Sequence, residues 1–307
     1  MNGKDVLNKF GFDIKEEPVS IYPYSPVYRV KHEERDVIVK RTQEHAERLM
    51  EYTSMLKRNV VKVVTPVKLD EENPQRIGEY NFVVYPFIEG TTYTGSDREI
   101  FEAGQLLGKI HSLSPDSNTY GLPEYDVYDF NQDEVEESMA AITKHIREAQ
   151  LTFDLESLRD VLQEAVIVQG ELQQTDLPHI ATTYDYKANN LIMTPEPYLI
   201  DPDNATWAPR IFDLALALLL FHNEHHDAPD RVFTTQEWKT FLSGYQTYVE
   251  LTEAEKRHWE RAKRHIFLDE VIWLMAEYPE DWQNPAQQKL FLSLNQMILP
   301  NADYRLE

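Results

Sequence analysis

The chain has 307 residues, of which 42% are hydrophobic and 11% aromatic, and its formal net charge is −23. This is globular composition at a length that allows two packed lobes or one large domain. The negative charge argues against a nucleic-acid or anionic-membrane surface, because both need basic patches. It favours a cationic ligand, although acidity also serves solubility and does not decide this. With no cysteine, no membrane-length apolar run and no signal pattern in "MNGKDVLNKF", we expect a cytoplasmic protein without disulfides.

The first 90 residues alternate apolar and polar positions in several short runs. This alternation is typical of strands, and "HEERD" reads as a hairpin turn. Between the strands, residues 42–59 place Leu49, Tyr52 and Leu56 at helical spacing, with Thr42 as the expected N-cap. The strands that we predict cover residues 19–24, 26–30, 36–41, 60–69 and 80–90.

Beyond Gly90 the pattern becomes that of helices, interrupted near residues 179–203 by short apolar runs that predict one small hairpin. The sequence therefore predicts an α+β fold with two lobes, a small antiparallel β-rich lobe of residues 1–88 and a mainly helical lobe of residues 89–307. A hinge near residues 86–90 joins them. The predicted helices of the second lobe cover residues 97–113, 133–150, 154–174, 210–224, 235–248 and 252–277.

The segment "TTYDYKANNLIM" places Asp185, Lys187 and Asn190 between apolar runs, and Asp201 ends the strand "PYLID". If the hairpin forms, the oxygen-bearing side chains meet at one end of it. Carboxylate and amide oxygens suit Mg²⁺, and Lys40 at the end of "DVIVK" suits a phosphate. Each feature alone is typical of a turn or a strand end. Their order along the chain is what indicates phosphoryl transfer.

This order resembles the aminoglycoside phosphotransferase and choline kinase-like family, which has a protein-kinase-like fold. "TYDYKANNLIM" is similar to the family's run His-Gly-Asp-x4-Asn, and "LIDPDNATWAPRIFDLA" is similar to its metal segment. "AGQLLGKIHSL" and "FLSGYQTY" resemble helices of its second lobe. The resemblance extends from about residue 17 to residue 280.

The resemblance implies a phosphotransferase that uses ATP and Mg²⁺ and acts on a hydroxyl group of a small molecule. The acceptor would be an aminoglycoside or another antibiotic, an amino alcohol or a sugar. Asp185 would be the catalytic carboxylate, Asn190 and Asp201 would bind Mg²⁺, and Asp213 would brace the loop. A catalytically silent kinase-like protein, such as a spore-coat-type binding module, is the alternative, and a plain α+β binding protein is a third possibility.

The resemblance also implies that residues 1–88 form a nucleotide-binding lobe. Lys40 would contact the α and β phosphates, with Glu51 pairing it from the following helix. In the hinge, the carbonyl group of Pro86 and the amide group of Ile88 would contact adenine. No oligomeric state is predicted.

Three departures from the family pattern affect these expectations. Thr183 and Tyr184 stand where the family has His and Gly, so the support of the loop must differ. "IYPYSPVYRV" has no glycine to help a backbone cradle for phosphate. Lys187 stands where the family often has His. It is either a catalytic residue that neutralises the transferring phosphoryl group or a solvent-facing lysine.

Some acidic and histidine residues have two interpretations. We favour Asp203 as a turn residue over a third acidic group near the metal. Asp269 and Glu270, beside Trp273, fit an ordinary amphipathic helix better than a site for an amine-bearing acceptor, which remains open. The histidines of "FHNEHHDAPD" fit a polar loop better than a metal site.

Overall fold

The computed structural model describes residues 2–22, 25–223, 225–300 and 302–307. Its first part is a four-stranded antiparallel sheet with the strand order β1-β2-β4-β3. The strands are β1 (Val27–His32), β2 (Arg35–Thr42), β3 (Gln75–Ile77) and β4 (Tyr80–Pro86). A short helix, α1 (Gly3–Lys9), packs against one face of this sheet.

The alternation of side chains along the strands divides the sheet between two cores. Phe82 and Val84 of β4 pack with α1, whereas Val83 and Tyr85 belong to the large core of the molecule. On β2, Val39 faces α1, so its neighbour Lys40 extends from the opposite face. Strand alternation thus directs Lys40 toward the rest of the protein.

Two of the predicted strands are wrong. Residues 19–22 form no strand, and residues 23 and 24 lie outside the described residues. Residues 60–69 form a connection with a single bridge, between Val63 and Leu199. Val61, Val63 and Val64 of this connection are buried in the large core. The apolar pattern therefore reflects burial of a segment that makes a backbone hydrogen bond to the sheet, from Val67 to Val84, but is not one of its strands.

The helices of the sequence prediction are present with shifted ends, and α1 and α10 were not predicted. The second helix begins at Ala46 because Thr42 still belongs to β2, and its N-cap is His45. The long predicted helix of residues 252–277 is divided by a π-helical turn, Phe267–Val271. The helices are α2 (Ala46–Arg58), α3 (Asp97–Ser112), α4 (Gln132–Glu148), α5 (Leu155–Gln173), α6 (Arg210–Leu220), α7 (Thr235–Tyr245), α8 (Glu253–Ile266), α9 (Ile272–Glu277) and α10 (Pro285–Ile298).

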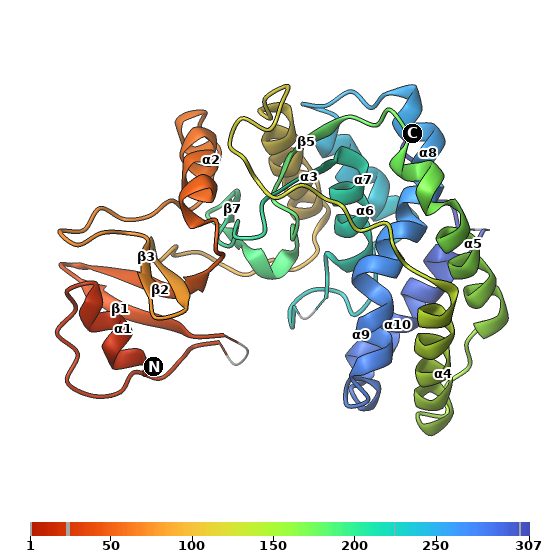
Figure 1. Ribbon diagram of the computed structural model, residues 1–307, viewed down its shortest axis with the longest axis horizontal. Coiled ribbons are helices and arrows are strands. Elements are labelled where there is room, and N and C mark those ends of the chain that lie inside the picture. The colour runs from red at the N-terminus through yellow and green to blue at the C-terminus, as the bar shows by residue number, and fades with distance from the viewer. Residues whose placement is uncertain (1, 23–24, 224, 301) are drawn as a thin grey trace.

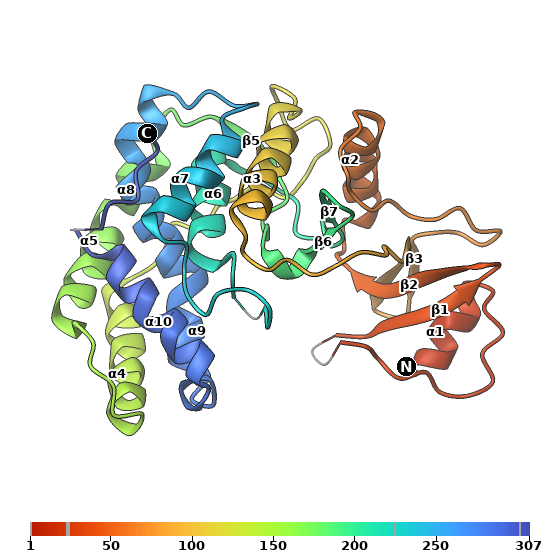
Figure 2. The ribbon, with the colours of Figure 1, turned by 180° about the vertical axis from the view of Figure 1, so that it is seen from behind.

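The sheet and α1 occupy one end of the molecule, and α4 to α10 occupy the other (Figure 1). Seen from behind, α2 stands between the sheet and α3 (Figure 2). Two short pairs of strands lie in this middle region: β5 (His179–Thr182) with β8 (Thr206–Pro209), and β6 (Leu191–Met193) with β7 (Pro197–Leu199). Within the described ranges, no helix has both the length and the apolar character needed to cross a lipid bilayer.

A close helix crossing fixes α3 against α7. A Cβ atom on Gly104 would lie 2.0 Å from the carbonyl oxygen of Phe241, and one on Gly244 would lie 2.0 Å from that of Phe101. Only glycine permits this approach of two backbones. The crossing gives α3, which follows the hinge, a fixed position in the helical part.

The end of α2 suggests a test of the local backbone. Val60 follows the C-cap Asn59 and has a φ angle of 60°. The amide of Val60 donates to the carbonyl oxygen of Lys57, and the amide of Val61 donates to that of Leu56. This is the Schellman arrangement, in which glycine is preferred. A β-branched residue is strained there, so Val60→Gly should raise the free energy of unfolding by about 0.5–1 kcal/mol in urea denaturation.

The matched control is Val19→Gly, because Val19 is 85% exposed and has no positive φ. This variant should be neutral or slightly less stable. An equal gain in both variants would contradict strain at Val60 as the cause.

Candidate active site

The two short strand pairs bring the loop of residues 183–190 beside the segment of residues 200–205. Thr182 pairs with Thr206, and Leu191 pairs with Leu199. The amide of Ile200 donates to the carbonyl oxygen of Asn190 at 2.9 Å, which closes the gap between the segments. The polar side chains of both segments therefore meet in one place.

Asp185 and Asn190 are locked together within the first segment. The Nδ2 atom of Asn190 donates to the backbone oxygen of Asp185 at 2.8 Å and to its carboxylate at 3.1 Å. The Nζ atom of Lys187 lies 3.1 Å from Oδ1 of Asp185. Burial raises the pKa of the Asp185 carboxyl, and the positive charge of Lys187 opposes that rise. Because Nδ2 is used, Oδ1 of Asn190 is the atom available to a metal ion.

Lys40 contacts the second segment through two ion pairs. Its Nζ atom lies 2.6 Å from Oδ2 of Asp201 and 3.3 Å from Oδ2 of Asp203. Burial acts to lower the pKa of the Lys40 ammonium, but the two carboxylates outweigh it and the pKa is raised. The pairing that we expected with Glu51 is wrong: Glu51 lies on the exposed face of α2.

Asp203 is also not the simple turn residue that we favoured. It is 6% exposed, and its Oδ1 atom accepts a hydrogen bond from the Tyr85 hydroxyl at 3.1 Å. Burial raises its pKa to about 6 against the pull of Lys40. The sequence signal was weak, because the partners of Asp203 lie on strands that are distant along the chain.

Except for Asp203, these residues line a cleft of about 500 Å³. Apolar side chains line it from the sheet and from the hairpin, including Ile38, Ile192 and Ile200. Glu51 is not on its wall. The predicted site residues that line this one cleft are Lys40, Pro86, Ile88, Asp185, Lys187, Asn190 and Asp201.

The donor set at the cleft fits Mg²⁺, although no group of three His, Cys, Asp or Glu residues in the described part is arranged for a metal ion. Magnesium needs only one or two protein ligands when phosphate oxygens and water supply the others. Oδ1 of Asn190 and the carboxylate of Asp201, whose side chain is 36% exposed, offer such a set.

A second cavity of about 500 Å³ lies on the other side of the loop. Tyr184, Glu270 and Trp273 line it. Among the described residues, Asp185 and Lys187 are the two that both cavities share. Whatever enters either cavity therefore meets the same carboxylate and the same ammonium group.

Residues 23–265 match the phosphotransferase enzyme family. The chain belongs to this family. A comparison of the sequence with curated proteins finds no match. The resemblance on which the sequence analysis rested is thereby confirmed.

Several solved structures share the fold. An amicoumacin kinase in complex with AMP-PNP, Ca²⁺ and Ami has a TM-score of 0.68 at 15% identity, covering 100% of this chain and 96% of that one. A microcompartment-associated aminopropanol kinase has a TM-score of 0.64 at 15% identity, covering 99% and 98%. A choline kinase from Streptococcus pneumoniae has a TM-score of 0.56 at 18% identity, covering 95% and 98%. The predicted two-lobed, protein-kinase-like α+β fold is confirmed. The boundary at residue 88 and the site roles stay predictions.

In this family member, Tyr184 stands at the position of the glycine in the family's pattern. Its backbone is left-handed, with a φ angle of 42°. The ring of Tyr184 packs against Tyr125, with centroids 5.7 Å apart. The hydroxyl of Tyr125 donates to Oδ2 of Asp269 at 2.8 Å, and that of Tyr184 does so at 3.4 Å. The strained backbone thus places an aromatic ring on the wall of the second cavity.

Glu270 belongs to the π-helical turn and not to the regular amphipathic helix that we favoured. Burial raises the pKa of its carboxyl to about 7, and the charges of Asp269 and Asp185 add to the rise while Lys187 opposes it. Within the described residues it has neither a hydrogen bond nor an ion pair. A buried carboxylate without a hydrogen-bond or ion-pair partner among the described residues favours a positively charged group in the cavity.

Thr183 replaces the family's histidine and is fully buried. The loop is supported from elsewhere: the Tyr186 hydroxyl donates to the carbonyl oxygen of Ala103, and the Ala188 amide donates to that of Phe221, both at 2.8 Å. The glycine-free segment includes residues 23 and 24, which lie outside the described residues.

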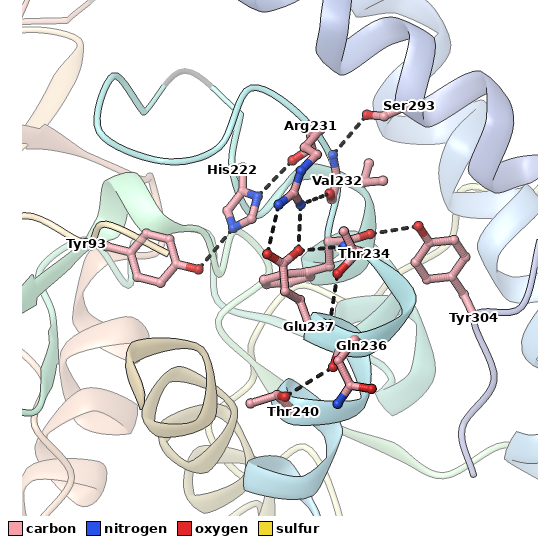
Figure 3. A network of polar contacts seen from close by, with 11 residues as sticks. Tyr93, His222, Arg231, Val232, Thr234, Gln236, Glu237, Thr240, Ser293 and Tyr304 are labelled. Atoms are coloured by element: carbon pink, nitrogen blue, oxygen red, sulfur yellow. Dashed lines mark hydrogen bonds and ion pairs between the residues drawn. The ribbon is translucent and has the colours of Figure 1, made fainter. Parts of the chain in front are cut away.

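His222 and Arg231, which follow α6, belong to a network of polar contacts with α7 and with Tyr93 (Figure 3). Nδ1 of His222 donates to the carbonyl oxygen of Arg231 at 2.8 Å, so Nε2 accepts from the Tyr93 hydroxyl at 3.0 Å. Burial lowers the pKa of His222 to about 4. Arg231 pairs with Glu237 of α7. His222 thus connects the segment after the hinge to α7.

Asp213, which we expected to brace the loop, offers a test of a buried pair between α6 and α3. It is fully buried on α6, and Nε2 of His111 donates to its Oδ2 atom at 2.9 Å. Removing one partner of a buried pair leaves an uncompensated charge. His111→Leu should therefore lower the free energy of unfolding by about 3 kcal/mol in urea denaturation.

Adding Asp213→Asn to the His111→Leu variant should recover part of that loss, because no carboxylate is then left unpaired. Asp213→Asn alone is the control. If the two losses simply add in the double variant, the pair does not depend on charge.

Proposed function

We propose that the protein is a kinase that uses ATP and Mg²⁺ and phosphorylates a hydroxyl group of a small molecule that carries an amine. The observation that carries the proposal is the position of Asp185 and Lys187, the two residues shared by both cavities. An in-line transfer needs a donor on one side, an acceptor on the other, and a carboxylate and a cation where they meet.

The first cavity suits the nucleotide. Pro86 and Ile88 lie on its wall, and the Ile88 amide has no hydrogen-bond partner among the described residues, so it is available to an adenine nitrogen. Lys40 at the opposite wall suits the phosphates. Mg²⁺, when bound by Asn190 and Asp201, neutralises phosphate charge.

In the transfer, Asp185 accepts a hydrogen bond from the acceptor hydroxyl and directs its oxygen at the γ-phosphorus. The new P–O bond forms as the bond to the β-phosphate oxygen breaks, and ADP leaves. The hydroxyl proton passes late to Asp185. Lys187, 3.1 Å from Asp185, adds positive charge where the transition state spreads negative charge.

The second cavity suits an amine-bearing acceptor. Glu270 provides a carboxylate that lacks a partner in the described part of the chain, and Trp273 and Tyr184 provide aromatic faces for cation–π contact. Two of the similar structures are kinases of aminopropanol and choline, and both names denote alcohols with a cationic nitrogen. The net charge of −23 points the same way.

The nucleotide and the catalytic carboxylate are tested separately. Mg²⁺ with ATP should raise the melting temperature of the protein, and Asp201→Ala should abolish that shift. In a screen of amino alcohols, amino sugars and antibiotics, Asp185→Asn should reduce ATP-dependent turnover by roughly 10²-fold or more. It should leave the nucleotide shift in place, because Asp185 is assigned to the acceptor hydroxyl.

A flat thermal response of the unmutated protein would favour the catalytically silent alternative. Turnover that survives in Asp185→Asn would reject Asp185 as the catalytic carboxylate and leave the nucleotide site standing.

Glu270 should make acceptor binding depend on pH. Its carboxyl is mostly charged above pH 7 and mostly neutral below it, because its pKa is raised to about 7. The KM for an amine-bearing acceptor should therefore rise roughly tenfold from pH 8 to pH 6, because the ionised fraction of a carboxyl group with this pKa falls about tenfold over that range. The KM for ATP should change much less.

Glu270→Gln is the matched variant. It should have a high acceptor KM at both pH values, with the pH dependence removed. A pH dependence that persists in this variant would show that another group recognises the acceptor.

A further inference from the structure

Helix α2 offers no carboxylate to Lys40. Its two acidic residues, Glu47 and Glu51, are both exposed. The side of α2 that packs inward is apolar, with Leu49 and Leu56 fully buried. A buried ammonium group must be paired, so Lys40 needs its partner from another part of the fold.

The two carboxylates that pair with Lys40 differ in their surroundings. The side chain of Asp201 is 36% exposed and lines the cleft, whereas that of Asp203 is 8% exposed and lines a neighbouring cavity of about 360 Å³ together with Lys40 and Asp201. Asp201 is thus the more open of the two carboxylates to a ligand from the cleft.

Asp203 is also fixed in place. Its Oδ1 atom accepts from the hydroxyl of Tyr85, whose side chain is 2% exposed. Tyr85 lies on β4, which is paired directly with β2, the strand of Lys40. The sheet therefore positions the ammonium group of Lys40 and the phenol that orients its partner as one rigid unit.

We propose that Asp203, and not a glutamate of α2, is the residue that positions Lys40 for the nucleotide phosphates. Tyr85 fixes the carboxylate, and Asp201 is left to the metal ion. This inference rests on the proposed function for its consequence in catalysis, but the pairing itself is a property of the protein without ligands. Asp203 acts through Lys40 and is a positioning residue.

The different roles proposed for Asp201 and Asp203 follow from the different exposure of their side chains. If Asp201 held Mg²⁺, Lys40 would keep one carboxylate, that of Asp203. Without Asp203, Asp201 would have to serve both the ammonium group and the metal ion, and each would be bound less well. The position of Lys40 also becomes independent of α2, because no side chain of that helix pairs with it.

The pairing is tested by double-mutant cycles on the unliganded protein. Thermal unfolding is measured for Lys40→Met, Asp203→Asn and Glu51→Gln, and for the two double variants that contain Lys40→Met. The Tm losses of Lys40→Met and Asp203→Asn should add to clearly more than the loss of their double variant. The losses of Lys40→Met and Glu51→Gln should be additive.

Additive losses in the Asp203 cycle, or coupling in the Glu51 cycle, would overturn the inference. Because no nucleotide is present, this result stands even if the thermal response to ATP is flat and the proposed function fails. Tyr85→Phe should weaken the coupling between Lys40 and Asp203, since Oδ1 then loses its donor.

Kinetics separate positioning from metal binding. Asp203→Asn should raise the KM for ATP roughly tenfold, as expected for a lost charge-assisted contact, and Asp203→Glu should restore part of it. Glu51→Gln should change the KM less than about twofold, as is usual for an exposed charge. If Asp203→Asn instead raises the Mg²⁺ requirement as much as Asp201→Asn with no change in the KM for ATP, Asp203 is a metal ligand and the inference is wrong.

Discussion

The ammonium group of Lys40, buried between Asp201 and Asp203, is the interaction on which the rest of the site depends. Lys40 belongs to the sheet, and both carboxylates belong to the segment that follows the small hairpin. The same contact therefore joins the sheet to the middle region that carries the two short strand pairs, and it lies on the wall of the first cleft. Its geometry is set by β2 and β4, because alternation directs Lys40 and Tyr85 to the same side.

The loop of residues 183–190 depends on a second constraint, the pairing of short strands. Two pairs of three or four residues each are weak alone. They are stabilised because their flanking residues donate into larger helices, as Tyr186 does to α3 and Ala188 to the end of α6. Support from helices allows Thr183 and Tyr184 to replace the histidine and glycine of relatives. Tyr184 then contributes a ring to the wall of the second cavity and has a strained backbone.

The sequence predicted the members of the site better than their contacts. Asp185, Asn190 and Asp201 were predictable because a hairpin brings residues that are close along the chain to one end. The partner of Lys40 was not, because helical spacing shows which residues share a face of α2 but not which face meets the sheet. Tyr85 and Asp203 are 118 positions apart, and no local pattern links them. The prediction of a strand at residues 60–69 was wrong for a related reason. Alternation of apolar and polar residues indicates which side chains are buried, but not whether the segment pairs with a strand.

Charge balance connects the two cavities. Lys187 is a cation near both Asp185 and Glu270, and it opposes the rise in the pKa of each carboxyl. Among the described residues, the carboxylates of Asp185, Glu270 and Asp269 outnumber the ammonium group of Lys187 around the second cavity. In the proposed function, a cationic acceptor would add positive charge next to Glu270, and the charge of Lys187 would remain beside Asp185 and the phosphoryl group. An uncharged alcohol of the same shape would not add that charge, so the proposed preference for an amine follows from the same balance.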